Sequence, residues 1–168
     1  MTAAEAGPRP GVVQLDVMNG DLRIERVRWW HLSAIARMET AIFGPEAWSE
    51  GVLWSELAAG HDYRAVLDGA DGDRIAGYAG TAFGDAEAWI NNIAVDAAHR
   101  RRGIAAMLMD DLLARARAGG AKSVFLEVAV DNAPAQRLYD RYGFYGIGVR
   151  KNYYQHTGTD AAVMRMDL

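Results

Sequence analysis

The chain has 168 residues, of which 51% are hydrophobic, and it contains no cysteine. A chain of this size predicts one domain whose core folds without disulfides or metal, and the lack of cysteine excludes zinc–thiolate sites, iron–sulfur clusters and catalytic thiols. Its formal charge of −4 argues against a nucleic-acid partner that is bound through bulk positive charge.

The start of the chain differs from the rest in composition, because it contains Pro8, Pro10 and three glycines without a sustained hydrophobic period. We expect a disordered tail at 1–20, in which the apolar run at 12–15 is at most a stray strand, and a single domain at 21–168. The tail lacks the basic start and apolar run of a signal peptide, and no stretch reaches 18 consecutive apolar residues. We therefore expect a cytoplasmic protein with no membrane partner.

Hydrophobic spacing and turn residues predict the elements of the domain in chain order. The predicted strands cover 22–27, 63–67, 75–83, 89–95, 124–128, 147–152 and 161–168. The predicted helices cover 32–42, the segment between a Ser49 cap and Gly60, 103–118, and 133–142 behind a cap at Asp131 or Asn132. This order indicates an α+β fold in which about six to seven strands form a mostly antiparallel sheet, flanked by about four helices.

A basic turn follows the strand at 89–95 and opens the next helix. Arg100, Arg101 and Arg102 lead directly into Gly103. The first turn of a helix exposes unpaired backbone N–H groups and the positive end of the helix dipole, so this turn predicts an anion site suited to a pyrophosphate. Its spacing is neither that of a Walker loop nor that of a dinucleotide fingerprint. The alternative is three solvated arginines before an ordinary helix.

Two residues beyond this turn are candidates for acid–base chemistry. Glu127 interrupts an apolar strand, where a carboxylate is costly to bury without a partner or a function, unless it faces solvent through the pleat. Tyr139 lies seven residues beyond Asn132, close to two helical turns, so the two share a face of their helix. We expect the Tyr139 hydroxyl to be partly exposed and outside the core; the alternative is a tyrosine that only packs.

Four short motifs occur in a fixed order along the chain. They are Asn92-Ile93-Ala94-Val95, Arg100-x-x-Gly103-x-Ala105, Asn132-Ala133-Pro134-Ala135 and Leu138-Tyr139-x-x-x-Gly143-Phe144. In this order and spacing they resemble the acetyl-CoA motifs of the GCN5-related N-acetyltransferase (GNAT) superfamily, and the similarity covers about 21–168. The resemblance implies the GNAT fold and acetyl-CoA as the cosubstrate.

Further motifs narrow the resemblance to one group. They are Leu126-Glu127-Val128, Arg150-x-Asn152-Tyr153-Tyr154 and the Trp48-Ser49 pair. These resemble the RimI-type ribosomal-protein-alanine N-acetyltransferases, which acetylate the N-terminal alanine of a small-subunit ribosomal protein. Ala106 and Ala129 stand where that group usually has arginine, at positions that bear on a phosphate contact and on the peptide preference.

The resemblance implies a role for each candidate residue. Glu127 is the base that takes a proton from the amine, directly or through a water, and Tyr139 is the acid that protonates the leaving thiolate. Trp48, Tyr153 and Tyr154 are substrate-side residues, for which the alternative is ordinary packing. The residues expected to bind acetyl-CoA are Ile93, Ala94, Val95, Arg100, Arg101, Arg102, Gly103, Ile104, Ala105, Ala106 and Asn132.

The implied reaction is direct attack of an amine on acetyl-CoA in a ternary complex, since no thiol is present to form an acyl-enzyme. The pantetheine arm would lie along 89–95, with a backbone N–H near Val95 facing the thioester oxygen. The expected partner is a ribosomal protein N-terminus, and we expect a monomer or weak dimer with no metal and no nucleic acid. Two alternatives stay open: acetyl transfer to a small amine such as a polyamine or an antibiotic, and a non-catalytic acyl-CoA-binding module.

Overall fold

The computed structural model describes residues 21–168, so the expected tail at 1–20, with its apolar run at 12–15, lies outside the described residues. The strands are β1 (Leu22–Arg26), β2 (Asp62–Asp68), β3 (Arg74–Phe83), β4 (Glu87–Val95), β5 (Ser123–Ala129), β6 (Tyr145–Tyr154) and β7 (Thr159–Asp167). The helices are α1 (Leu32–Phe43), α2 (Glu50–Ala58), α3 (Ile104–Ala118) and α4 (Ala133–Tyr142). Within the described part of the chain, none of these helices is long and apolar enough to cross a membrane.

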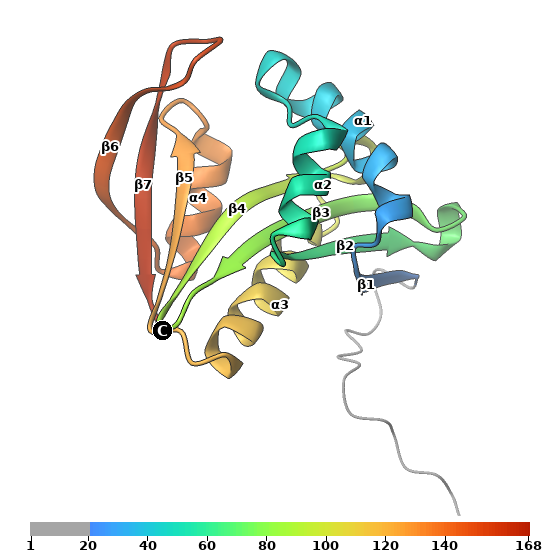
Figure 1. The fold of residues 1–168 in the computed structure, drawn as a ribbon, viewed down its shortest axis with the longest axis horizontal. Coiled ribbons are helices and arrows are strands. Elements are labelled where there is room, and N and C mark those ends of the chain that lie inside the picture. The colour runs from blue at the N-terminus through green and yellow to red at the C-terminus, as the bar shows by residue number, and fades with distance from the viewer. Residues whose placement is uncertain (1–20) are drawn as a thin grey trace, which may run out of the picture.

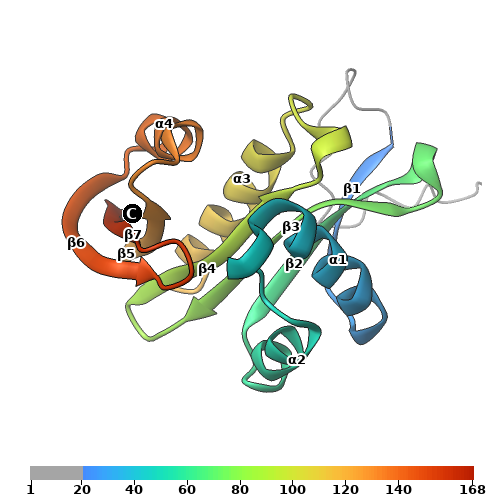
Figure 2. The same cartoon turned by 90° about the horizontal axis from the view of Figure 1, so that it is seen from above.

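The strands of residues 21–168 form one seven-stranded sheet in the order β1-β2-β3-β4-β5-β7-β6. Every neighbouring pair is antiparallel except β4 and β5, which are parallel. Helices α1 and α2 cover one face of the sheet, and α3 and α4 cover the other (Figures 1 and 2). This architecture confirms the predicted α+β class and its mostly antiparallel sheet.

The two parallel strands separate part-way along their length. Residues Glu87–Ile90 of β4 pair with Ser123–Leu126 of β5, and the register ends there. Beyond that point β4 continues to Val95 and β5 to Ala129, and Figure 1 shows the two strands diverging into a V. The backbone groups that β4 would offer to β5 are therefore available at the opening.

A β-bulge lies in β4 at the base of this V. Gly80 of β3 pairs with Asn92, whereas the next residue, Thr81, pairs with Ile90, so Asn91 has no counterpart in β3. A bulge of this kind bends its strand and changes the direction of the local side chains. Here it places Asn91 and Asn92, which follow one another in sequence, on the wall of the same cavity.

Strand β3 is rich in small residues because its neighbours leave no room for larger ones. A Cβ atom at Gly80 would lie 2.2 Å from the ring of Tyr63, and one at Gly77 would lie 2.8 Å from the Ile104 side chain. Side chains there would have to displace packed atoms. The close approach of Ile104 fixes the first turn of α3 against the sheet, and this turn is the predicted anion site.

The predicted helix boundaries hold to within about two residues. The Ser49 side chain accepts a hydrogen bond from the Val52 amide at 3.3 Å, and the Asn132 side chain accepts one from the Ala135 amide at 3.2 Å. Asn132, rather than Asp131, is thus the cap of α4. Helix α3 begins one residue later than predicted, because Gly103 adopts a left-handed conformation (φ 75°) immediately before it.

Candidate active site

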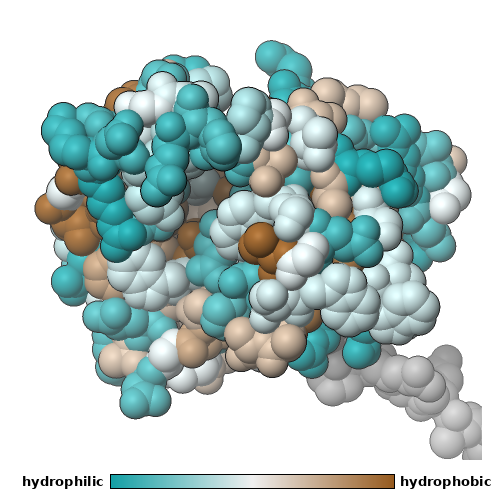
Figure 3. All heavy atoms as spheres, turned by 45° about the horizontal axis from the view of Figure 1, so that its top comes forward, coloured by the Kyte–Doolittle hydropathy of each residue, from teal (hydrophilic) through white to brown (hydrophobic). Residues whose placement is uncertain are grey.

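A cavity of about 600 Å³ occupies the opening between β4 and β5, within the usual size range of small-molecule sites. Figure 3 shows this face hollowed, with hydrophobic residues visible in the hollow and hydrophilic residues gathered along one side of it. The structure brings most of the predicted site residues to its wall. They are Trp48, Ile93, Ala94, Val95, Arg100, Ala105, Glu127, Asn132, Tyr139, Tyr153 and Tyr154.

The other predicted residues lie at the start of α3, beside the cavity and not on its wall. They are Arg101, Arg102, Gly103, Ile104 and Ala106. Arg101 and Gly103 both have a positive φ (64° and 75°), which turns the chain sharply into the helix. The Ile104 side chain is buried in the core, so only its backbone N–H could meet a ligand.

Arg102 has a defined protein partner. Its Nη1 lies 2.5 Å from Oδ2 of Asp68, a carboxylate that is 3% exposed at the end of β2. The Arg102 guanidinium holds the pKa of the Asp68 carboxyl below its usual range. Buried His99 lies between Asp96 (2.8 Å) and the same Asp68 (3.4 Å). This cluster fastens the basic turn to the β2–β3 connection.

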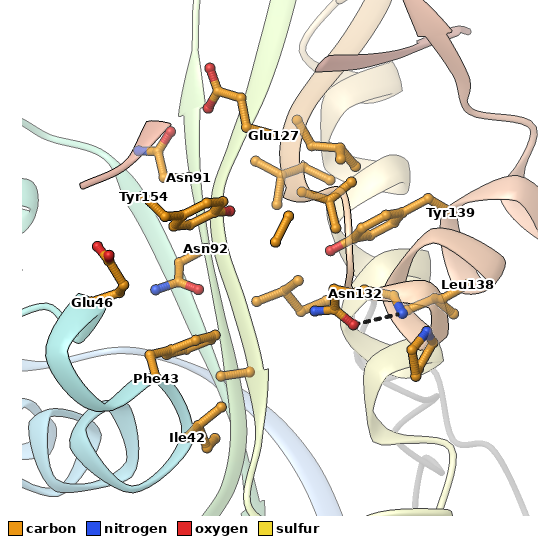
Figure 4. Close-up of a pocket in the computed structure, with 18 of the residues that line it drawn as sticks. Ile42, Phe43, Glu46, Asn91, Asn92, Glu127, Asn132, Leu138, Tyr139 and Tyr154 are labelled. Carbon is orange, nitrogen blue, oxygen red and sulfur yellow. Dashed lines mark hydrogen bonds between the residues drawn. The ribbon is translucent and has the colours of Figure 1, made fainter. Parts of the chain in front are cut away.

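Glu127 projects from β5 at the edge of the cavity, with 15% of its side chain exposed. Arg150 of β6 approaches Oε1 of Glu127 at 2.8 Å, and the Tyr153 hydroxyl donates to Oε2 at 3.2 Å. The carboxylate is therefore held by two partners at the cavity and does not face open solvent through the pleat. Its orientation leaves it within reach of a group that enters between β4 and β5 (Figure 4).

Tyr139 lies in the core, contrary to the expectation from the sequence. The residue is only 5% exposed, and its ring packs 5.8 Å from the ring of Phe144 within the core. The prediction of a partly exposed tyrosine outside the core is wrong, because α4 turns this face down onto the sheet. The hydroxyl nevertheless points into the cavity (Figure 4). Burial, and then the nearby Tyr154, raise the pKa of Tyr139 well above its usual value, so the phenol stays protonated.

Asn132 and Tyr139 share the cavity-facing side of α4, as their spacing predicted (Figure 4). The Asn132 side-chain oxygen is occupied by the helix cap. Its amide nitrogen is the part that could act as a donor to a bound group. Asn132 can thus serve the fold and a ligand at the same time.

Aromatic side chains line the part of the cavity away from Asn132. Tyr153 is 41% exposed, and its ring meets that of Tyr154 edge-on at 5.1 Å. Burial, together with Tyr153 and Glu127, raises the pKa of Tyr154 to about 12. Trp48 lies across the opening, partly buried against the α1–α2 core. These residues form an amphipathic wall of the kind that suits a peptide end.

Comparison with known proteins shows the family to which the chain belongs. The model of the Acetyltransferase (GNAT) family matches residues 27–144, which is more than half of the chain. The chain belongs to the GNAT acetyltransferase family. It is therefore an acetyl-CoA-dependent N-acetyltransferase.

Two relatives that match most of the chain carry related names. N-alpha-acetyltransferase RimI of Mycobacterium tuberculosis is 36% identical over 137 residues, which cover 79% of this chain and 84% of that one. The [ribosomal protein bS18]-alanine N-acetyltransferase of Salmonella typhimurium is 37% identical over 123 residues, or 72% and 81% of the two chains.

Solved structures agree with the sequence relatives. The ribosomal-protein-S18-alanine N-acetyltransferase from Escherichia coli superimposes with a TM-score of 0.78 at 28% identity, covering 87% of this chain and 93% of that one. Arabidopsis thaliana NAA60, solved in complex with acetyl-CoA, shares the fold with a TM-score of 0.77 at 19% identity, over 88% and 99% of the chains. The expected GNAT fold is confirmed.

The cavity wall of this acetyltransferase contains a further acidic residue, Glu39, for which the sequence analysis predicted no role. Glu39 of α1 is completely buried, and its carboxylate accepts hydrogen bonds from Tyr78, from the Asn92 amide at 2.9 Å and from the Trp48 backbone at 2.9 Å. Burial raises the pKa of Glu39. Its position among the apolar residues of α1, four after Ile35, was the available signal. Glu39 joins α1, β3, β4 and the loop that carries Trp48.

Proposed function

We propose that this acetyltransferase transfers the acetyl group of acetyl-CoA to the N-terminal α-amine of a protein, and specifically to the N-terminal alanine of a small-subunit ribosomal protein. One observation carries the proposal: a single cavity places a held carboxylate, Glu127, and a buried phenol, Tyr139, beside the opening between β4 and β5. The names of the relatives at 36–37% identity support the choice of substrate.

The acetyl-CoA site follows from the open strand edge and the helix start. Strand β4 is unpaired with β5 beyond Ile90, so its backbone can receive the pantetheine arm as an added strand would be received. The pyrophosphate then meets the N–H groups at the start of α3 and the flanking Arg100 and Arg101. A backbone N–H near Val95 faces the thioester oxygen and stabilises the negative charge that develops there.

Glu127 serves as the base in this scheme. An α-amino group has a pKa of about 7.7–8.0, so a useful fraction is already neutral at pH 7 and a modest base is sufficient. A lysine side chain, with a pKa of about 10.4, would need much more assistance. The carboxylate, directly or through one water, accepts the proton that the amine loses as it attacks in a ternary complex.

Tyr139 serves as the acid. Its raised pKa keeps the phenol protonated across the working pH range, so the proton is in place when the thiolate forms, although the same shift makes the phenol a weaker acid than an ordinary tyrosine. The proton passes to the thiolate of CoA as the thioester bond breaks. Tyr153, Tyr154 and Trp48 then form the wall that holds the peptide end.

A substrate panel tests the proposal. Values of kcat/KM would be measured for short peptides that begin with alanine, the same peptides with a blocked N-terminus, a polyamine and an aminoglycoside. We expect the unblocked alanine peptides to be preferred by at least about tenfold, since binding energy along the peptide is used in the transition state. Preference for a free polyamine or aminoglycoside would replace the proposal by the small-amine alternative. Acetyl-CoA binding without transfer to any amine would indicate a binding module.

A further inference from the structure

Glu46 links two segments that lie more than 100 residues apart in the sequence. Its Oε1 accepts hydrogen bonds from the backbone amides of His156 at 2.7 Å and Thr157 at 3.1 Å. Glu46 ends the short 3-10 turn Gly44–Glu46 between α1 and α2, whereas His156 and Thr157 form the turn between β6 and β7. Figures 1 and 2 both show these two connections side by side.

The link lies at the wall of the cavity, because Glu46 and Thr157 both line it. The end of α1 and the connection to α2 bring Phe43 and Trp48 to one side of the cavity, and the β6–β7 hairpin brings Tyr154 to its wall as well. Glu46 itself lines the same space, on the side of the α1–α2 connection (Figure 4). Any amine that approaches from this side passes beside the link.

The hairpin end that Glu46 holds is internally fixed. The Gly158 amide donates to the Tyr154 carbonyl at 2.8 Å, and the Asn152 amide donates to Asp160 Oδ1 at 2.8 Å. The register between β6 and β7 is interrupted between Arg150 and Tyr154, so the end of the hairpin is offset from the sheet ladder. A contact at residues 156–157 therefore sets the position of Tyr154 as well.

We propose that Glu46 is a positioning residue whose carboxylate clasps the β6–β7 turn to the α1–α2 connection and so sets the width of the amine entrance. The proposal rests on the proposed function for the identity of the amine. Two backbone N–H groups converging on one anionic oxygen make charge-assisted hydrogen bonds, which are stronger than neutral ones. The enzyme thereby selects a narrow, extended chain end and holds it against Tyr154.

Amide hydrogen exchange tests the clasp without any substrate. Exchange at His156 and Thr157 would be followed by NMR in the wild type, Glu46→Ala and Glu46→Gln. We expect Glu46→Ala to accelerate both amides by roughly tenfold, and Glu46→Gln, which keeps an oxygen acceptor but loses the charge, to fall in between. Glu50→Ala is the matched control, since it removes a nearby carboxylate that contacts Ser33 and not the hairpin. Unchanged exchange in Glu46→Ala would overturn the clasp.

Steady-state kinetics test the consequence for the entrance. With the preferred amine of the wild type, Glu46→Ala should raise the KM for that amine about three- to tenfold, change kcat less, and leave the acetyl-CoA affinity unaltered. Faster exchange without a change in KM would show a link that does not shape the entrance, and would refute the proposal. Equal losses in Glu46→Ala and Glu46→Gln with unchanged exchange would indicate direct contact with the amine instead. If the preferred amine is not a peptide, the proposed function fails while the exchange result still decides the clasp.

Discussion

Glu127 has both carboxylate oxygens engaged, one by Arg150 and one by Tyr153. Glu127→Gln keeps the size of the side chain and removes the base, so turnover at neutral pH should fall by roughly 10²–10⁴-fold with acetyl-CoA affinity nearly intact. The defect should shrink at higher pH, because more of the amine is then already neutral. Initial rates from pH 6 to 9.5, with calorimetry for acetyl-CoA, would measure both effects. Wild-type turnover throughout this range would assign the base to another group.

Tyr139 combines a buried ring with a hydroxyl in the cavity, and two substitutions separate these roles. Tyr139→Phe retains the packing on Phe144 and removes only the proton donor, so we expect a turnover loss of roughly 10²–10⁴-fold with a nearly unchanged melting temperature. Tyr139→Ala also creates a cavity and should cost about 3–5 kcal/mol of unfolding free energy. Normal turnover by folded Tyr139→Phe would mean that the thiolate leaves without this proton.

Glu39 predicts a pH effect on stability. Burial raises its folded-state pKa above the ordinary value of 4.5, so the folded protein holds this proton more tightly than the unfolded chain does. The Glu39 contribution is therefore most favourable below pH 4.5 and is lost as pH rises through the folded-state pKa. Urea unfolding from pH 4 to 7 should show the wild type losing stability relative to Glu39→Gln as pH rises. A difference that stays constant or grows with pH would contradict a raised pKa.

The sequence predicts the position of a residue in the structure when that position depends only on its neighbours in the chain. A cap at Asp131 or Asn132 and the interruption of β5 by Glu127 are features of short segments, and the structure places the cap at Asn132 and both Asn132 and Glu127 in the cavity wall. The burial of Tyr139 was missed because it depends on which face of α4 meets the sheet. The ion pair between Arg102 and Asp68 joins residues 34 positions apart, and no local pattern contains it.

At the scale of elements, Arg101 and Arg102 at the start of α3 are expected to have different roles, because Arg102 forms an ion pair with Asp68. Arg101→Glu should weaken acetyl-CoA binding about tenfold or more and leave the melting temperature unchanged, because it acts on the anion site. Arg102→Glu should weaken binding and also lower the melting temperature by roughly 2–8 °C, because it places a second carboxylate against buried Asp68. Calorimetry and thermal unfolding of both variants distinguish the roles. Equal melting temperatures would contradict a stabilising Arg102–Asp68 pair.

Element order and boundaries follow closely from sequence periodicity, since each helix and strand carries its own pattern of apolar residues. Periodicity does not predict the divergence of β4 from β5 or the bulge at Asn91. Both arise from how strands pair across the sheet, and strand register is set by partners that lie far away in sequence. The cavity lies where these two unpredicted features occur, and the predicted helices and strands form its surroundings.

At the scale of the whole molecule, the sheet brings together functional residues from its first four strands and its last three. The half formed by β1–β4 with α1 and α2 supplies Glu39, Glu46 and the open edge of β4, and the half formed by β5–β7 with α4 supplies Glu127 and Tyr139. The reaction we propose occurs where the halves separate. Neither half alone contains a complete site, so a truncation after β4 should abolish transfer altogether.

The most direct test of this account is to locate the acetyl group on a product. A peptide with an N-terminal alanine and an internal lysine would be incubated with acetyl-CoA and the purified enzyme, and the product would be sequenced by tandem mass spectrometry. The account predicts a single acetyl group on the alanine α-amine, and its loss when Glu127→Gln is used at neutral pH. Acetylation of the lysine with an unmodified N-terminus would contradict it.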